Sequence, residues 1–564
     1  MSCLSIKWVI LFLAFVFFQV HHCRSNDVFV DSAESEPFVD AIDRSNPATH
    51  QPPEPGHEKL YTYRSICMSD EGKMRILHGF DCRYQVAVGR FRNAVNDSGW
   101  SFLEIETKPE YPPEIQAYAA GVLEGNLSSV VIGYHIQNVI EDYCKNYTEY
   151  CKRLNNFIDE NMKWIKEELA KKQPDDAYWA EVNRTLHQLT GLYHGYDGAM
   201  LSPNISFERH PILMLNMHGG DFYDLEKKFN KTVDPNHEKC SGLVKVAPDN
   251  ADLFISQVTM SGYENMMRVL KLYKFGFDKK IVPGHTTTFS SYPAMLYSSD
   301  DFALMSSGLI PSWLRVKVAN ELASTAREWC EIFERYNSGT YNNQWVILDY
   351  KRFTPGKGLP PNELLFVLEQ VPGTVVYRDL TWYLRKHTYF PSYNVPYFKN
   401  ITTLSGYDKY AEKMGDWFRW DAAPRARIFE RDHSKVVDID SLTKLMRYND
   451  YKHDEFSRCN CTPPYSAEAA ISARGDLNPP DGVYPLPFMG HRNHGGLDYK
   501  GTNYALFKRL RFHAIGCPTY DDVPAFQWSK FDYDTKVKHV GHPDLWKFEV
   551  IETRWETPNV RADL

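Results

Sequence analysis

Several features that would place this sequence in a common functional class are missing from it. The chain has no run of Lys and Arg, and its 64 basic residues are outnumbered by 72 acidic ones, which leaves a net charge of −8. Because nucleic-acid binding relies on concentrated positive charge, we exclude that class. The sequence also lacks a GxxxxGK[ST] loop, an HExxH pair and a GxSxG turn. These absences argue against a P-loop nucleotide site, a zinc hydrolase and an ordinary serine lipase.

Long apolar runs are also scarce. Apart from the 13-residue run over residues 8–20, no segment approaches the ~18 uninterrupted apolar residues that a membrane helix needs. That run follows Lys7 and is typical of a signal-peptide core. We therefore expect a signal peptide over residues 1–23, a mobile arm rich in Pro, Ser and acidic residues over 24–58, and no transmembrane segment in the mature chain.

The remainder has the composition of a folded protein, with 43% hydrophobic and 14% aromatic residues. Eight Asn-X-Ser/Thr acceptor sites follow the expected signal peptide. Together they predict a glycoprotein that is secreted or delivered to the lysosomal lumen. The acceptor residues are Asn96, Asn126, Asn146, Asn183, Asn204, Asn230, Asn400 and Asn460.

Cysteine is uncommon, and nine of the 11 cysteines lie beyond the leader. An odd number in an oxidising compartment implies at least one thiol outside the disulfides. Two pairs are close enough to suggest local disulfides, and a third is possible: Cys144–Cys151 and Cys459–Cys461, and then Cys67–Cys82. The pairing of the others stays open. Among them, Cys240 has the most unusual surroundings.

Cys240 stands where the character of the sequence changes. Residues 224–239 contain few apolar side chains, one Pro and many charges, which indicates an exposed linker. Residues 240–247 and 251–258, joined by a Pro-Asp-Asn turn, predict a β-hairpin. Residues 261–275 place apolar side chains at helical spacing and predict a helix.

A cysteine in this position could act as an N-terminal nucleophile. If the bond between Lys239 and Cys240 were cut, the thiol and a new α-amine would belong to one residue. An α-amine with a pKa of ~7.7–8.0 can take the proton of a thiol with a pKa of ~8.5, directly or through a water. The cysteine could make the cut itself by attacking the preceding carbonyl. The alternative is a buried, inert cysteine.

Other segments predict ordinary elements. Residues 112–169 have a largely helical pattern that puts Phe157, Met162 and Ile165 on one side. A second helix is expected over 313–336, capped by Ser312. Short strands are expected at 344–350 and 373–377.

Seven segments closely resemble, in order, the phospholipase B-like family, also called the lamina-ancestor proteins. They are CSGLVKVAPDNADLFISQVTMSGYENMMRVLKLY (240–273), FERYNSGTYNNQWVILDYKRF (333–353), GDWFRWDAAPRARIFERD (415–432), LMRYNDYKHD (445–454), AISARGDLNPPDGVYP (470–485), HGGLDYKGTN (494–503) and FQWSKFDYDTKVKHVGHPDLWKF (526–548). The resemblance extends from about Leu60 to the C-terminus.

The resemblance implies an α+β fold of the N-terminal nucleophile hydrolase type, an αββα sandwich of two antiparallel sheets between helical layers. It implies autocatalytic cleavage before Cys240 into fragments 59–239 and 240–564, folded as one unit. The implied activity is hydrolysis of ester or amide bonds, usually deacylation of phospholipids. We expect a lipid-like small-molecule substrate, no cofactor and no metal ion. The oligomeric state stays open.

The sequence departs from the family pattern in two places. Gln257 and Met260 stand where the family has His and Trp in an AHxxW arrangement. Gln can donate a hydrogen bond but cannot carry a proton as His does. A family segment with a Glu-Thr-Thr signature has no counterpart between Leu309 and Trp313. These departures leave an alternative open: a secreted glycoprotein that keeps the fold for binding or structure without the chemistry.

Two more roles follow from the chemistry of acyl transfer. The oxyanion that forms needs preorganised donors, for which the amides of Asn342 or Asn343 are candidates. The planar fork of Arg474 could orient a carboxylate or phosphate, or could simply pair with Asp476. The predicted catalytic residues are Cys240, Gln257, Asn343 and Arg474.

Overall fold

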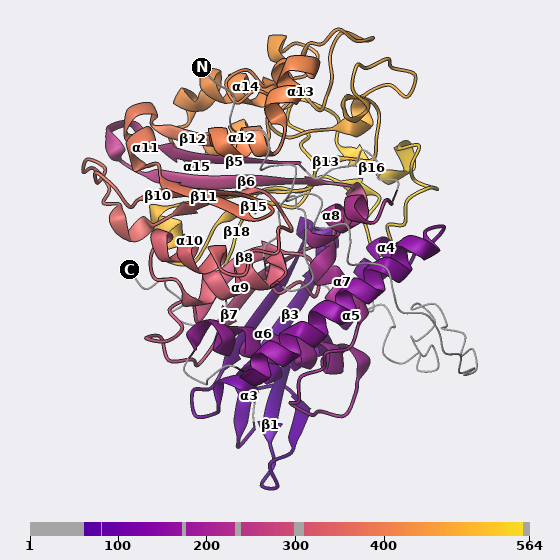
Figure 1. Cartoon of the computed structure of the whole chain (residues 1–564), viewed down its shortest axis with the longest axis vertical. Coiled ribbons are helices and arrows are strands. Elements are labelled where there is room, and N and C mark those ends of the chain that lie inside the picture. The colour runs from indigo at the N-terminus through magenta and orange to yellow at the C-terminus, as the bar shows by residue number, and fades with distance from the viewer. Residues whose placement is uncertain (1–60, 81, 172–175, 232–238, 298–308, 556–564) are drawn as a thin grey trace, which may run out of the picture. The chain divides into compact units, whose positions relative to one another are not determined.

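The computed structural model describes residues 61–80, 82–171, 176–231, 239–297 and 309–555 (Figure 1). All of them belong to the larger of the chain's two units, 48–564. The predicted signal peptide over 1–23 and the predicted arm over 24–58 lie outside the described residues.

The described chain is mixed α+β, as the family resemblance implied. A six-stranded sheet has the order β2-β1-β3-β4-β7-β8, in which β4 and β7 pair in parallel and the other neighbours are antiparallel. Its strands are β1 (Thr62–Met68), β2 (Met74–His78), β3 (Gln85–Ala94), β4 (Trp100–Thr107), β7 (Arg268–Lys274) and β8 (Thr286–Ser291).

A seven-stranded antiparallel sheet has the order β12-β5-β6-β14-β15-β18, with β13 also pairing with β6. Its strands are β5 (Lys239–Val246), β6 (Leu253–Ser261), β12 (Tyr389–Ser392), β13 (Gly495–Gly496), β14 (Tyr499–Asn503), β15 (His513–Ile515) and β18 (Ile551–Glu552). Two smaller antiparallel sheets are made of β9 (Gln344–Leu348), β10 (Leu365–Val371) and β11 (Thr374–Asp379), and of β16 (Phe526–Gln527) and β17 (Leu545–Trp546).

Helices pack against these sheets (Figure 1). Those before β5 are α2 (Val95–Ser98), α3 (Pro113–Leu127), α4 (Ser129–Val139), α5 (Thr148–Lys171), α6 (Ala177–Asp197), α7 (Pro211–His218) and α8 (Asp221–Lys228). Those after β8 are α9 (Ser312–Leu322), α10 (Ala326–Glu334), α11 (Thr381–His387), α12 (Lys399–Leu404), α13 (Tyr407–Met414), α14 (Pro424–Asp432), α15 (Ile439–Met446) and α16 (Tyr504–Phe507).

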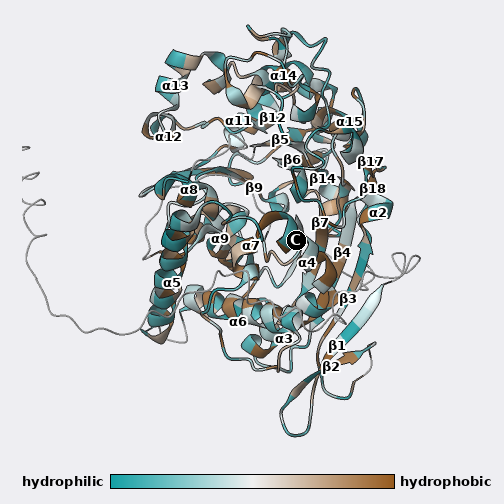
Figure 2. Cartoon of the chain, turned by 90° about the vertical axis from the view of Figure 1, so that its right-hand side faces the viewer, coloured by the Kyte–Doolittle hydropathy of each residue, from teal (hydrophilic) through white to brown (hydrophobic). Residues whose placement is uncertain are grey.

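The helical pattern expected over 112–169 is confirmed by α3, α4 and α5. On α5, the expected apolar side chains Phe157, Met162 and Ile165 are buried. Figure 2 shows the rest of this helix as mostly hydrophilic. No helix in the described part of the chain is long and apolar enough to cross a membrane.

The helix expected over 313–336 is divided in two, α9 and α10. Ala323 leaves helical geometry, and the side chain of Thr325 then caps α10 by accepting a hydrogen bond from the N–H of Glu328. Ser312, the expected cap, is the first residue of α9, and Pro311 precedes it as the N-cap.

The helix expected over 261–275 is wrong, because residues 268–274 form the strand β7. This strand lies between β4 and β8 and is buried on both faces, so period-two alternation is absent. Its polar residues have buried partners instead of facing water: Arg268 contacts Asp498, and Lys271 contacts Glu124. Pairing within the sheet therefore overrides the helical spacing.

The hairpin predicted after residue 239 is confirmed by the antiparallel pair β5–β6. The connecting turn, η3 (Pro248–Asn250), contains Asp249 and Asn250 at φ of 55° and 53°. Asp and Asn tolerate this left-handed region better than most residues, which explains why the turn forms here.

The exposed linker expected at about 224–239 does not begin at residue 224. Residues 224–228 belong to α8, where Asp224 and Leu225 are buried. The helix has Asp221 and Asp224 in its first turn and Lys227 and Lys228 in its last, an arrangement that suits the helix dipole. Residues 232–238 lie outside the described residues.

Helix α3 packs on the six-stranded sheet and against α6 at very short range. Glycines occupy the contact: Gly121 and Gly125 on α3, and Gly191 and Gly195 on α6. A Cβ atom on Gly121 would lie 1.9 Å from the backbone oxygen of Gln188. Only glycine therefore permits this approach of the two helices.

Three disulfides form among the described residues: Cys67–Cys82, Cys144–Cys151 and Cys459–Cys461. They include the two pairs that the short separations suggested. Cys240, Cys330 and Cys517 remain buried thiols.

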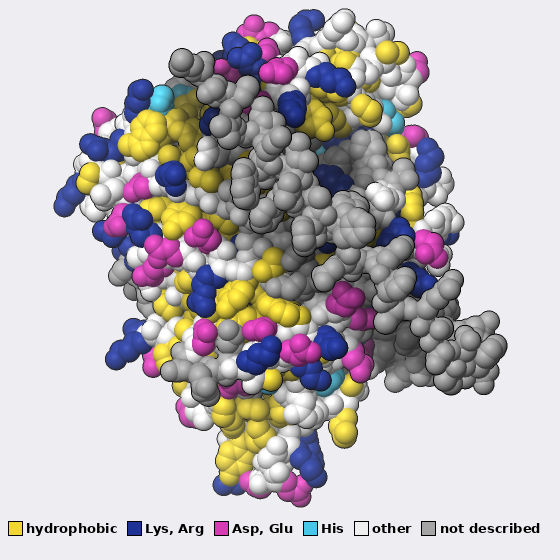
Figure 3. All heavy atoms as spheres, viewed as in Figure 1, with side chains coloured by type: hydrophobic (Ala, Val, Ile, Leu, Met, Phe, Trp, Pro, Cys, Tyr) yellow, Lys and Arg dark blue, Asp and Glu magenta, His cyan; other side chains and the backbone are white. Residues whose placement is uncertain are grey.

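The first of these disulfides ties the end of β1 to the segment before β3. Apolar side chains are exposed on β2 and just after it, with Leu77 at 40% and Phe80 at 50% exposure. Figure 3 shows hydrophobic side chains at the lower end of the molecule, where Figure 1 places β1.

Candidate active site

Cys240 is the second residue of β5 and is held at both of its backbone polar groups. Its N–H donates to Oδ1 of Asn394 at 2.9 Å, and its carbonyl accepts from Nη1 of Arg425 at 2.6 Å. Nη2 of Arg425 also donates to Oδ1 of Asn394 at 3.0 Å. The asparagine and the arginine therefore form a frame that fixes the orientation of the cysteine.

A cavity of about 430 Å³ lies over one face of the seven-stranded sheet, and Cys240 is part of its lining. Side chains alternate between the faces of a sheet, so the register shows which residues share this face. Gly242 pairs with Gln257, and Gln257 pairs with Lys500 on β14. The cavity floor thus brings the thiol, an amide and an ammonium group to one surface.

The other walls come from β8, β9, α9, α10 and the residues before β15. They include the apolar side chains of Phe289, Val316, Trp329, Trp345, Val346 and Phe512. Polar residues are nearly as numerous in these walls: Thr288, Ser290, Asn320, Asn343 and Gln344. Such a mixed lining suits a small organic molecule that has both an apolar and a polar part.

Three of the four predicted catalytic residues line this cavity: Cys240, Gln257 and Asn343. Asn342 and Met260 are not part of the lining, and Met260 is buried opposite Gly496 on β13. The shared cavity makes a joint chemical role for the first three residues geometrically reasonable.

Arg474 lies outside the cavity lining. Its fork donates to both carboxylate oxygens of Asp476 at 2.9 and 2.7 Å, and Nη1 donates to the carbonyls of Thr519 and Pro524. The side chain is 1% exposed. The guanidinium of Arg474 thus binds groups of the protein itself, which agrees with the alternative expected from the sequence, that Arg474 pairs with Asp476.

Sequence reasoning missed three residues at the site: Asn394, Arg425 and Lys500. Arg425 and Lys500 fall within the family-like segments 415–432 and 494–503, so the resemblance contained a signal for both. Asn394 has no such signal. It adopts a left-handed backbone conformation with φ of 63° just after β12.

Charges beside the cavity are balanced. The ammonium of Lys500 lies 3.0 Å from Oδ1 of Asp498 and donates to the hydroxyl of Thr259, the residue opposite Cys240 in the hairpin. Burial alone would raise the pKa of Asp498, but Arg268 and Lys500 outweigh burial and hold that pKa below its ordinary value. Asp498 therefore stays ionised and fixes Lys500 in the cavity wall.

Histidines near the C-terminal loops have partners other than a metal. His491 contacts Asp532 at 2.7 Å, and His494 contacts Glu468 at 3.0 Å. Within the described ranges, no group of three or more His, Cys, Asp or Glu side chains is arranged to hold a metal ion.

Comparison with known proteins identifies the family. The sequence profile of the family described as Phospholipase B matches residues 87–312 and 309–553. The chain is 59% identical over 529 residues to phospholipase B-like 2 of Caenorhabditis elegans, which covers 89% of this chain and 90% of that protein. It is 41% identical over 508 residues to phospholipase B-like 2 of Homo sapiens, with 84% and 86% coverage. It is 33% identical over 521 residues to phospholipase B-like protein B of Dictyostelium discoideum, with 86% and 88% coverage.

These matches cover most of the chain, so it belongs to the phospholipase B family. The two matched stretches meet at residues 309–312. The sequence predicts the loss of the Glu-Thr-Thr segment at this place, and that loss stays a prediction.

Proposed function

We propose that this chain is an acyl hydrolase whose nucleophile is the thiol of Cys240, and that autocatalytic cleavage after Lys239 frees the α-amine of the same residue. Family membership supports the reaction class. The observation that carries the proposal is the placement of Cys240: it lines a cavity of about 430 Å³ with apolar and polar walls, while Asn394 and Arg425 hold its backbone. The fold would be the αββα sandwich of N-terminal nucleophile hydrolases.

In the maturation step, the thiol of Cys240 attacks the carbonyl carbon of Lys239, and the C–N bond between the two residues breaks. The products are a thioester on Sγ and a free α-amine. Water then hydrolyses the thioester, which leaves a carboxylate on Lys239 and returns the thiol. Oδ1 of Asn394, which accepts from the N–H of Cys240, can accept from the α-amine after the cut.

In turnover, the α-amine takes the proton of the thiol, and the thiolate attacks the acyl carbon of the substrate. Donors at Asn343 stabilise the resulting oxyanion, and the amide of Gln257 adds a hydrogen bond. The leaving alcohol takes the proton from the ammonium, and water hydrolyses the acyl thioester. The apolar walls suit an acyl chain, so a phospholipid-like ester is the proposed substrate; an amide would use the same residues.

The proposed location is the lysosomal lumen or the extracellular fluid, reached through the predicted signal peptide. The disulfides agree with an oxidising compartment. None of the eight acceptor asparagines is buried: Asn126 and Asn183 are half-buried, and the other six are exposed. Glycosylation at these residues remains a prediction.

A second function is favoured by one observation. Gln257 lines the cavity, and the family resemblance of the sequence implies a proton-carrying His at this position. If that loss abolishes turnover, the protein is a secreted glycoprotein that keeps the fold for binding or structure.

The test is fatty-acid release from phosphatidylcholine and from an N-acyl amine by protein secreted from a eukaryotic host. Cys240→Ala should abolish release, whereas Cys330→Ala, which removes a buried thiol outside the cavity, should retain it. Release that survives Cys240→Ala would contradict the proposed nucleophile. A correctly cut wild-type protein without release would support the non-enzymatic alternative.

A further inference from the structure

A second, smaller cavity of about 130 Å³ also includes Asn394 and Arg425 in its lining. Its walls come from the residues after β12, the segment from α13 through η6 (Asp416–Phe418), the start of α14 and two loops further along the chain. The two residues that hold the backbone of Cys240 therefore belong to both this cavity and the surroundings of the thiol.

Aromatic rings dominate the lining of the smaller cavity. The rings of Trp417 and Phe488 have centroids 5.3 Å apart, and those of Phe418 and Phe488 meet edge to face at 6.2 Å. Tyr407 lies 6.0 Å from Phe418 and donates its hydroxyl hydrogen to the carbonyl of Asn394. These contacts make a continuous apolar wall.

The charged groups of the lining already have partners within the protein. Arg425 donates to the carbonyls of Cys240 and Tyr393, at 2.6 and 2.7 Å. Glu468 is held by Arg492 at 2.8 Å and by His494 at 3.0 Å. A ligand therefore gains more from contact with the apolar surface than from polar contacts.

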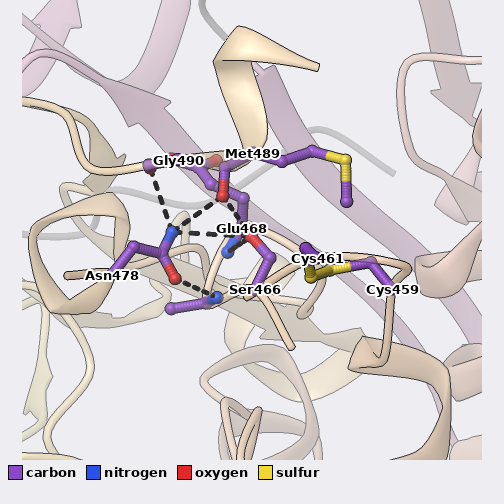
Figure 4. Close-up of a disulfide and its surroundings, with 8 residues drawn as sticks. Cys459, Cys461, Ser466, Glu468, Asn478, Met489 and Gly490 are labelled. Carbon is purple, nitrogen blue, oxygen red and sulfur yellow. Dashed lines mark hydrogen bonds between the residues drawn. A yellow bond between two sulfur atoms is a disulfide. The ribbon is translucent and has the colours of Figure 1, made fainter. Parts of the chain in front are cut away.

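One wall of the cavity is fixed by hydrogen bonds, which Figure 4 shows. Nδ2 of Asn478 donates to the carbonyls of Met489 and Gly490, both at 3.0 Å, and its Oδ1 accepts from the N–H of Ala467 at 2.9 Å. This asparagine ties the segment that follows Phe488 to the segment that contains Glu468. The cavity is thus preformed, as ligand sites usually are.

The size of the cavity limits what enters it. A dry apolar cavity of ~150 Å³ accommodates benzene, so 130 Å³ suits about six carbon atoms. Apolar surface also continues outward: Tyr410 stacks on Phe418 at 5.5 Å and is 51% exposed, and Met414 is 40% exposed. We propose that this cavity binds the end of a hydrocarbon chain of a lipid. Such binding does not require that Cys240 be catalytically active.

The experiment is quenching of tryptophan fluorescence by 12-bromododecanoate, in the full-length Cys240→Ala protein so that no turnover intervenes. Trp417 lines the smaller cavity, whereas Trp345 lines the larger one. We expect saturable quenching that Trp417→Phe removes in large part and that Trp345→Phe retains. Quenching that is lost only in Trp345→Phe would place the chain in the larger cavity and overturn the proposal, as would the absence of saturable quenching.

A second variant tests the same site by filling it. Ala469 is buried in the cavity wall, so Ala469→Leu should weaken binding about ten-fold or more, because the leucine takes the place of several chain carbons. Unchanged affinity in a folded Ala469→Leu protein would contradict the proposal. If this variant does not fold, the comparison of Trp417→Phe with Trp345→Phe still decides the question.

Discussion

Glu369 is a buried carboxyl group whose replacement by Gln should remove part of the pH dependence of stability. It lies in β10, 1% exposed, and accepts hydrogen bonds from the N–H groups of Tyr397 and Phe398 at 2.7 and 3.0 Å. It also accepts from the side chain of Gln344, which lines the larger cavity, at 2.7 Å. Burial outweighs these three bonds and raises the pKa of Glu369 from 4.5 to about 7.

The magnitude follows from linkage between protonation and folding. At ~1.4 kcal/mol for each pH unit, the raised pKa of Glu369 corresponds to about 3 kcal/mol of stability. The direction of this pH dependence follows because the carboxyl group of Glu369 holds its proton more tightly in the folded protein than in the unfolded chain. The contribution is therefore fully present below pH 4.5 and is lost as the pH rises through about 7. Such a group favours the folded state in an acidic compartment.

The assay is urea unfolding at about pH 4.5 and about pH 8 in a Cys240→Ala background, so that cleavage before residue 240 does not complicate unfolding. Between the two pH values, the protein with Glu369 should lose about 3 kcal/mol more stability than Glu369→Gln. Glu331→Gln, on an exposed position of α10, is the matched control. Burial lowers the pKa of His218 to about 4, which acts in the opposite direction. The test is therefore the difference between the protein with Glu369 and Glu369→Gln in the stability that each loses between the two pH values. Equal losses in these two proteins would refute the reasoning.

Three further predictions concern helix packing and the site. Gly121→Ala should reduce the free energy of urea unfolding by more than about 2 kcal/mol, because its Cβ would clash with the backbone of α6. The control is Gly133→Ala, whose Cβ would have no neighbour closer than 3.6 Å and which should change that free energy by less than about 1 kcal/mol. Equal effects of the two substitutions would contradict the close contact between α3 and α6. Gln257→His should increase fatty-acid release about ten-fold or more, because it restores a proton carrier, and an unchanged rate would exclude that role. Arg425→Lys should slow formation of the new N-terminus at Cys240 about ten-fold or more, because Lys cannot donate to both the carbonyl of Cys240 and Oδ1 of Asn394 in the way that the guanidinium does. Arg427→Lys, on the exposed side of α14, is the control and should leave that rate unchanged. Equal rates in the two variants would contradict the frame around Cys240.

The parts of the fold that could be predicted from sequence depend on local signals. The β5–β6 hairpin follows from two short runs rich in apolar residues and a Pro-Asp-Asn turn between them, a local signal that needs no distant partner. Strand β7 could not be predicted in this way, because its polar residues find partners far along the chain. Lys271, for example, contacts Glu124, 147 residues earlier. The helical spacing over 261–275 takes no account of such distant partners, and it therefore predicts a helix where the strand β7 forms.

The same distinction applies to the site. The family resemblance singles out Gln257, which reaches the surroundings of Cys240 through the β5–β6 hairpin, a local element. Asn394 and Arg425 are 154 and 185 residues from Cys240 and arrive through the pairing of β12 with β5 and the start of α14. No local spacing relates them to the cysteine.

We expect Cys240 to become an N-terminal nucleophile. The decisive experiment is N-terminal sequencing with intact mass, under reducing conditions, on secreted wild-type protein and on Cys240→Ala. A second N-terminus should be found at Cys240 in the wild type and should be absent from the variant. A single uncut chain in both proteins, in acidic as well as neutral buffer, would contradict this expectation.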